Sequence, residues 1–67
     1  MKISYKPLWR QLVENNMSKM DLLHASKISA CTLAKFSKNE PVRLEILMRI
    51  CESLNCRIEN VVEFIHE

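Results

Sequence analysis

Glycine is absent from the 67 residues of this sequence, and only two prolines are present. Loops that cradle phosphate groups, and many tight β-turns, depend on glycine because it takes up positive φ angles without steric cost. The composition therefore argues against a glycine-rich nucleotide-binding loop and against a turn-rich all-β fold.

The sequence also lacks any apolar run near the ~18 residues that a membrane-spanning helix needs. Its start, MKISYKPLWRQL, contains no signal-peptide core, so we expect a cytoplasmic protein. The three cysteines, Cys31, Cys51 and Cys56, lack the spacing of a disulfide framework, which fits a reducing compartment. No C-x-x-C pair is present, which disfavours a metal site built from the cysteines and His24. We predict no metal and no cofactor.

A chain of this length is expected to form one domain, and so small a domain buries only ~60% of its unfolded surface. It has no room for a catalytic cleft between domains. His24 and His66 have no nearby serine or cysteine in the arrangement of a nucleophilic triad, and the acidic residues are scattered. The sequence therefore predicts a single domain over residues 1–67 that is not an enzyme and has no small-molecule substrate.

Apolar residues recur at helical spacing in five segments, which predicts an all-α fold of five short helices. The helices are expected to begin near residues 7, 18, 30, 44 and 58, and the last three to end near residues 37, 54 and 65. Residues 2–5 precede them as an extended arm. Trp9 and Phe36 are assigned to the core and not to base stacking.

Local signals mark the ends of the second and third predicted helices. Ser18 is a favourable N-cap residue, and Asp21 follows it at the spacing of a capping box. Ser29 is the expected N-cap of the third helix, and Asn39 can adopt the left-handed conformation that ends it. Pro41 then prevents continuation, because the residue before a proline avoids the helical region.

Residues 18–38 thus have the layout of a helix-turn-helix, two short helices joined by a tight turn. Apolar side chains in this segment fit two helices folded onto each other, namely Leu22, Ile28, Leu33 and Phe36. The outward positions of the later helix carry small or hydrogen-bonding residues, namely Ala30, Cys31, Thr32 and Lys35. Such a helix is suited to the major groove of DNA.

Charged residues are unevenly distributed along the chain. Residues 1–43 carry eight Lys and Arg against three Asp and Glu, whereas residues 44–67 carry two against five. The basic part contains the predicted helix-turn-helix, so a polyanion would be steered toward one end of the protein. An alternative is that the charges only solvate the surface, but that does not explain why the asymmetry coincides with the motif.

The order of these segments resembles the lambda-repressor-like family of DNA-binding proteins, also called the Cro/phage-repressor or XRE type. The resemblance runs through YKPLW, SKMDLL, KIS, TLAKFSKNEP, LEILMRICESLNC and VVEF, and so covers nearly the whole chain. Within the family the chain is most similar to short stand-alone bacterial regulators. Lys27 departs from the pattern, because the family usually has glycine at this turn position, and it must therefore adopt a positive φ.

This resemblance implies a five-helix domain with the helix-turn-helix at helices 2 and 3, acting as a sequence-specific DNA-binding transcriptional regulator. By position it places Ala30, Cys31 and Lys35 against DNA bases, with Thr32 beside them near the phosphates. The alternative for Lys35 is an ordinary solvated lysine. For Cys31, a small side chain tolerated against DNA is the simpler reading, and a redox sensor is the alternative.

Further residues are expected to contact DNA phosphates. Lys19 lies at the start of the second predicted helix, where a helix N-terminus can meet a phosphate. Lys38, Asn39 and Arg43 flank the loop into the fourth helix, which resembles the phosphate-contacting clamp of the family. These contacts would position the protein and not read sequence. A second function is left open, in which the same fold serves as a protein-interaction module, such as an antitoxin or anti-regulator.

The apolar side chains of the last predicted helix exceed what one buried face requires. Phe64 and Ile65 are left near the surface, and Ile3 and Tyr5 of the arm are candidates to join them. One recognition helix reads too few base pairs to select a genomic site, and two-fold dimers solve this problem. We therefore predict a homodimer through Phe64 and Ile65. The alternative is that these side chains close the core of a monomer.

Overall fold

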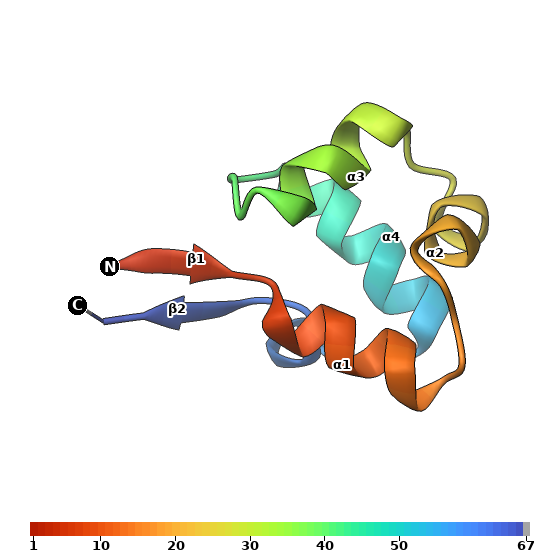
Figure 1. Cartoon of the computed structure of the whole chain (residues 1–67), viewed down its shortest axis with the longest axis horizontal. Helices are drawn as coiled ribbons and strands as arrows, with labels where there is room; N and C mark the ends of the chain where they lie inside the picture. Colours follow the sequence, from red (N-terminus) through yellow and green to blue (C-terminus); the bar gives the residue numbers. More distant parts are fainter. Residues whose placement is uncertain (67) are drawn as a thin grey trace.

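The computed structural model describes residues 1–66, and in this range four α-helices form the body of the molecule (Figure 1). A two-stranded sheet projects from one side of the helical body and carries both ends of the chain. The elements in chain order are β1 (Lys2–Ser4), α1 (Lys6–Glu14), α2 (Lys19–Ser26), α3 (Ala30–Ser37), α4 (Leu44–Leu54), the 3₁₀ turn η1 (Ile58–Asn60) and β2 (Glu63–Ile65).

Caps fix the N-termini of α2 and α3 as the sequence predicts. The Ser18 hydroxyl accepts from the Asp21 backbone N–H at 3.1 Å, and the Asp21 carboxylate accepts from the Ser18 N–H at 2.9 Å. The Ser29 hydroxyl accepts from the Thr32 N–H at 3.2 Å and so caps α3. These bonds satisfy backbone donors that have no partner inside the helices. The capping predictions are confirmed.

Left-handed residues end or connect the helices in place of glycine. Asn16, Lys27, Asn39 and Asn55 have positive φ angles between 51° and 56°. Asparagine tolerates this region better than most residues. Lys27 has no such preference, and its φ of 56° confirms the conformation that the helix-turn-helix imposes on it.

The core lies where α1, α2, α3 and α4 meet. Phe36 of α3 is fully buried, and its ring meets that of Tyr5 edge-on, with centroids 4.6 Å apart and planes at 75°. Edge-to-face packing is a favourable arrangement of aromatic rings. The buried apolar residues form one cluster, made of Tyr5, Leu8, Leu12, Leu22, Ile28, Phe36, Leu47, Ile50 and Val61.

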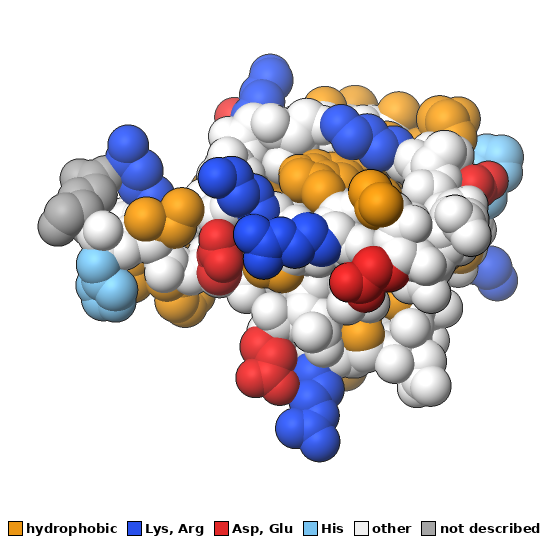
Figure 2. Space-filling model, turned by 60° about the horizontal axis from the view of Figure 1, so that its bottom comes forward, with side chains coloured by type: hydrophobic (Ala, Val, Ile, Leu, Met, Phe, Trp, Pro, Cys, Tyr) orange, Lys and Arg blue, Asp and Glu red, His pale blue; other side chains and the backbone are white. Residues whose placement is uncertain are grey.

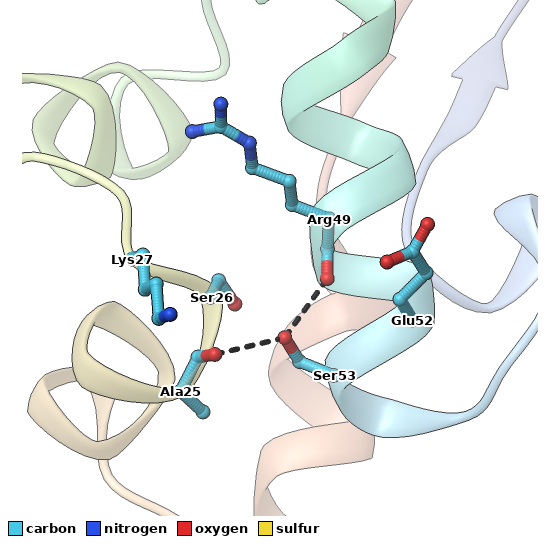
Figure 3. Close-up of a pocket in the computed structure, with 6 residues that line it drawn as sticks. All are labelled: Ala25, Ser26, Lys27, Arg49, Glu52 and Ser53. Atoms are coloured by element: carbon cyan, nitrogen blue, oxygen red, sulfur yellow. Dashed lines mark hydrogen bonds between the residues drawn. The ribbon is translucent and has the colours of Figure 1, made fainter.

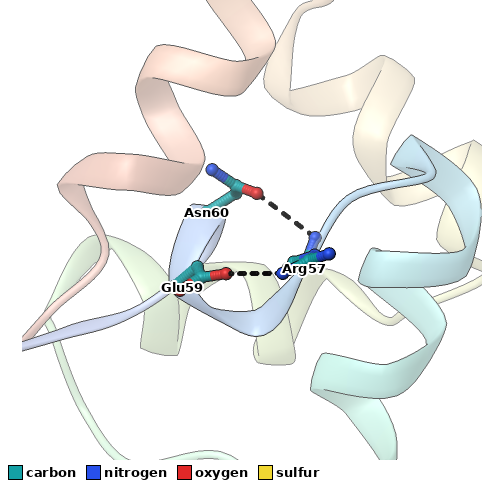
Figure 4. Close-up of polar contacts among 3 residues, drawn as sticks. All are labelled: Arg57, Glu59 and Asn60. Atoms are coloured by element: carbon teal, nitrogen blue, oxygen red, sulfur yellow. Dashed lines mark hydrogen bonds and ion pairs between the residues drawn. The ribbon is translucent and has the colours of Figure 1, made fainter.

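The predicted fifth helix is wrong. Residues 58–60 form only the short turn η1. The Arg57 backbone N–H donates to Asn60 Oδ1 at 3.3 Å, and the Arg57 guanidinium lies 3.8 Å from the Glu59 carboxylate (Figure 4). The chain then continues as β2, which pairs antiparallel with β1 so that Ile3 lies opposite Phe64. Aromatic and β-branched residues favour such a strand, and β1 has backbone groups that need partners. The fold is therefore four helices with a small sheet, and not all-α with five.

Tyr5 is buried and not part of a surface arm, which corrects the proposal that it joins a dimer interface. Only 1% of the residue is exposed. Its hydroxyl donates to the Glu40 carbonyl at 2.6 Å, and its backbone N–H donates to Asn39 Oδ1 at 3.3 Å. Burial raises the pKa of the Tyr5 phenol above its ordinary value. Tyr5 thus joins the start of α1 to the loop that follows α3.

Ser26 introduces a polar defect at the end of α2. Its Oγ is buried and is the one buried side-chain oxygen or nitrogen without a hydrogen-bond partner in residues 1–66. It lies beside a cleft of about 410 Å³ between the helix-turn-helix and α4 (Figure 3). There the Ser53 hydroxyl, on α4, contacts the carbonyls of Ala25 at 3.1 Å and Arg49 at 2.8 Å. An unsatisfied buried hydroxyl destabilises the fold.

Candidate nucleic-acid interface

Helix α3 has one buried side and one exposed side, and the predicted base contacts lie on the exposed one. Phe36 anchors the helix in the core, and Leu33 is half-buried against the core. Ala30, Cys31 and Lys35 are exposed. Since residues four apart lie one turn from each other, Cys31 and Lys35 are neighbours on the same surface. The structure thus brings the three residues onto one solvent-facing side.

Thr32 lies at the edge of that surface. It is half-buried, and its hydroxyl is 3.0 Å from the Ser29 hydroxyl in the N-cap of α3. A groove of about 230 Å³ opens beside it, and Lys35 of α3 and Arg43 at the start of α4 line the same groove. Three of the predicted contact residues, Thr32, Lys35 and Arg43, are therefore brought together around one concave surface that carries two cations.

The loop between α3 and α4 places Lys38, Asn39 and Arg43. Lys38 is the C-cap residue of α3, and its side chain is exposed. The Oδ1 of Asn39 is occupied by the Tyr5 N–H, so the groups it can offer to a ligand are the N–H donors of its side-chain amide. Arg43 is exposed, with Nη1 3.8 Å from the Glu45 carboxylate. An exposed ion pair of this kind is weak, so the guanidinium can exchange Glu45 for a phosphate.

Lys19 is the first residue of α2 and lies near a fixed negative charge. The Ser18 backbone N–H, followed by the Ser18 hydroxyl, holds the pKa of the Asp21 carboxyl below its ordinary value. The Asp21 carboxylate therefore occupies the N-terminal turn of α2, where an incoming phosphate would be repelled. The Lys19 ammonium, and not the backbone of the helix, is the group suited to a phosphate here.

The surroundings of Lys19 could not be predicted from the sequence. Trp9 was assigned to the core, and it is half-buried and packs against the core cluster. Its ring also meets Lys19, whose Nζ lies 4.6 Å from the ring centroid. The two residues are on different helices, separated by the turn that connects α1 to α2. No helical spacing links them, so the pattern of apolar residues gives no signal of the contact.

The cysteines differ in exposure. Cys31 is exposed on α3, whereas Cys51 and Cys56 are half-buried near the end of α4. Burial, and to a lesser extent the neighbouring Cys51, raises the pKa of the Cys56 thiol. Within residues 1–66 no three His, Cys, Asp or Glu side chains are grouped so that they could hold a metal ion. Over the same part of the chain, no helix has the length and apolar character to cross a bilayer.

Comparisons with known proteins agree with this geometry. The family described as the Cro/C1-type HTH DNA-binding domain matches residues 7–67. The crystal structure of the transcriptional regulator VanUg is similar over 98% of this chain and 88% of that protein, with 41% sequence identity and a TM-score of 0.94. A comparison with curated proteins finds no match.

Proposed function

The chain belongs to the family of Cro/C1-type helix-turn-helix DNA-binding domains, and from this premise we infer that it is a transcriptional regulator that binds double-stranded DNA. We propose that the exposed side of α3 enters the major groove. The observation that carries this proposal is the placement of Ala30, Cys31 and Lys35 on one solvent-facing side of a helix that Phe36 anchors in the core.

Each of these residues has a chemical role in the proposed complex. Lys35 donates to the O6 and N7 acceptors of guanine, and Ala30 packs against a thymine methyl group. Cys31 fits closely against the groove because its side chain is small. The phosphate contacts, which fix the register of the protein on the duplex, come from Lys19, Thr32, Lys38, Asn39 and Arg43.

A pair of lysine variants tests the assignment of α3. The preferred DNA site is first obtained by selection from random oligonucleotides. Lys35→Ala is expected to lose ~1–3 kcal/mol of binding free energy on that site and to relax specificity at one base position. Lys38→Ala is expected to weaken binding to all sequences about equally and to reduce the slope of log Kd against log salt by about one.

Filter binding over a range of salt concentrations gives both readouts. Equal losses for the two variants on selected and random duplexes would contradict the placement of α3 in the groove. A protein-interaction module on the same fold would show no steep salt dependence at all, so this measurement also separates that alternative from DNA binding.

Cys31 supports a chemical test of the same surface. Alkylation of this exposed thiol with a bulky reagent should abolish DNA binding while the helical circular dichroism signal remains. Cys51 and Cys56 should react more slowly, because both are half-buried and burial raises the pKa of Cys56. Rapid labelling of all three cysteines in the folded protein would contradict this placement.

We propose further that the protein acts as a two-fold homodimer through Phe64 and Ile65 of β2. Phe64 is 63% exposed and Ile65 42% exposed, on a strand whose partner among the described residues is β1 alone. An apolar strand at the edge of a small sheet is a favourable surface for a second copy. Helix-turn-helix dimers place their recognition helices ~34 Å apart on one face of the duplex, and we propose the same spacing for the two α3 helices here.

Phe64→Asp tests the dimer. Because Phe64 is largely exposed, the variant should fold and melt like the wild type but sediment as a monomer and bind the selected site much more weakly. Met48→Asp is the matched control, since Met48 is 56% exposed on α4 and belongs neither to the sheet nor to the proposed DNA contacts. A variant that unfolds would support closure of the monomer core by Phe64. A wild-type protein that stays monomeric, both at high concentration and on DNA, would refute the dimer.

The free cysteines and the single core bear on the cellular location and the domain organisation of the protein. We place the protein in the cytoplasm, where the free thiols of Cys31, Cys51 and Cys56 stay reduced. We regard residues 1–67 as one domain, which is supported by the single cluster of buried apolar residues. Its role is binding and not catalysis.

A further inference from the structure

The side chains of Trp9 and Lys19 form a contact that joins α1 to α2. The Lys19 Nζ lies over the indole ring, 4.6 Å from its centroid, which is within the range of a cation–π interaction. No carboxylate forms an ion pair with Lys19 anywhere in the described range of residues 1–66. The aromatic ring is therefore the group that restrains this ammonium.

The ring remains accessible beside the ammonium. Trp9 is half-buried and lines a surface groove of about 320 Å³ together with Arg10, Val13 and Glu14 of the same helix. Figure 2 looks toward the side of the molecule that carries α1, and it shows apolar side chains there with Lys and Arg side chains around them. Lys19 is itself exposed, so an external anion can reach its ammonium.

We propose that Trp9 is a positioning residue for DNA binding, which holds the Lys19 ammonium in place for a backbone phosphate at the N-terminus of α2. This inference rests on the proposed function, because it takes Lys19 as a phosphate contact. An ammonium has three N–H donors, so Lys19 can donate to a phosphate oxygen while it stays over the ring.

Two physical effects make the restraint useful. A free lysine side chain loses considerable rotamer entropy when it is immobilised on a ligand, and a side chain already restrained loses less. The Asp21 carboxylate in the same turn would repel a phosphate, so an ammonium fixed nearby offsets that repulsion. Trp9 should therefore raise affinity for all DNA sequences by the same factor without affecting specificity.

The test is a double-mutant cycle on the full chain, with affinity for the selected duplex measured at several salt concentrations. Trp9→Leu should weaken binding about two- to fivefold, the range expected for an exposed cation–π contact. Lys19→Met should weaken binding more and reduce the salt slope by about one. The double variant should bind like Lys19→Met alone, and Trp9→Phe, which keeps an aromatic face, should remain close to the wild type.

The outcomes separate this inference from the proposed function. If Trp9→Leu weakens binding equally with and without Lys19, the role of Trp9 is only structural and the inference is overturned. The inference also fails if Trp9→Leu has no effect while Lys19→Met does, a result that leaves DNA binding intact. If the wild type shows no salt-dependent DNA binding, the proposed function itself fails.

Tryptophan fluorescence gives a second readout that needs no substitution of Trp9, and so it remains usable if the Trp9 variants do not fold. Trp9 is the only tryptophan of the sequence, so its fluorescence reports the contact directly. Lys19→Met should change the emission of the free protein, whereas Lys38→Met, which removes a distant cation, should not. Added duplex should change the emission of the wild type, and high salt should reverse that change. An emission indifferent to Lys19→Met and to DNA would overturn the inference.

Discussion

The helix-turn-helix and the small sheet differ in how far apart in the sequence their interacting residues lie. In the helix-turn-helix, residues a few positions apart cap the helix ends, as Ser18 and Asp21 do. In the sheet, β1 pairs with β2 at the other end of the sequence. The two regions also differ in burial. Phe36 of α3 is fully buried, and Phe64 of β2 is 63% exposed. The contrast indicates that the side chain of Phe36 contributes to the core of the monomer, whereas that of Phe64 lies outside the core and is available for the proposed dimer.

The largest expected effect comes from comparing the two phenylalanines of the chain. Phe36→Ala should cost about 3–5 kcal/mol, comparable with the whole stability of a domain of this size, because it leaves a cavity in the buried core cluster beside Tyr5. Phe64→Ala should change the stability of the monomer by no more than about 0.5 kcal/mol. Urea denaturation followed by circular dichroism at low protein concentration measures both. Similar losses would remove the distinction between the regions.

A substitution at Ser26 is expected to increase the stability of the helix-turn-helix. Ser26→Ala should stabilise the protein by about 1–2 kcal/mol, because it removes a buried hydroxyl that has no partner. The control is Ser37→Ala, since Ser37 ends α3 as Ser26 ends α2 but is exposed, and so reports helix propensity together with the loss of one long, exposed hydrogen bond from its hydroxyl to the Leu33 carbonyl at 3.5 Å. The difference between the changes in melting temperature of Ser26→Ala and Ser37→Ala measures the cost of the unpartnered Ser26 hydroxyl. A loss of stability in Ser26→Ala would show that the hydroxyl has a favourable partner.

Tyr5 connects the two regions, so its hydroxyl tests their coupling. Tyr5→Phe should cost about 0.5–1.5 kcal/mol, because the Glu40 carbonyl loses its donor. Burial raises the folded-state pKa of Tyr5, so its stabilisation is fully present below the unfolded value of about 10 and is lost as pH rises through the folded value. The free energy of unfolding, measured from pH 8 to 11.5, should therefore fall less steeply with pH for Tyr5→Phe than for the wild type. Identical pH profiles would contradict the burial of the phenol.

The smallest expected effect concerns the exposed cap of α2. The pKa of Asp21 is lowered in the folded protein, first by the Ser18 backbone N–H and then by its hydroxyl. This contribution to stability is present above the unfolded pKa of about 3.9 and is lost as pH falls through the folded value. Asp21→Asn should therefore flatten the stability profile between pH 5 and pH 2 in thermal melts. If the wild type and Asp21→Asn lose stability in parallel as the pH falls, the prediction that the Asp21 carboxylate stabilises the folded state is wrong.

The helix-turn-helix could be predicted from sequence because its signals are local. Ser18, Asp21, Ser29 and Asn39 lie within a few residues of the helix ends that they close, and the structure places each of them as expected. The bounds of α3 and α4 follow from the same kind of signal. Family membership was likewise evident from these segments, and the comparisons confirm it.

Contacts between distant residues could not be predicted in the same way. Val61 and the apolar residues after it fit a helical spacing, but β1 offers backbone partners that only a strand can use, and this competition is invisible in a local window. The burial of Tyr5 depends on the carbonyl of Glu40, and the position of Lys19 depends on Trp9. None of these pairs follows a helical or strand period.

The pairing of β1 with β2 also sets an order of assembly. Lys2 lies opposite Ile65, so the sheet closes almost the longest loop that the chain can form, and loop closure of this kind slows folding. During synthesis the helix-turn-helix can form as soon as α4 has emerged, whereas β1 must wait for the last residues of β2. The edge that carries Phe64 and Ile65 is therefore completed last. A folding intermediate with native helices and an unpaired β1 would therefore have a packed helical core before the surface proposed for the dimer has formed.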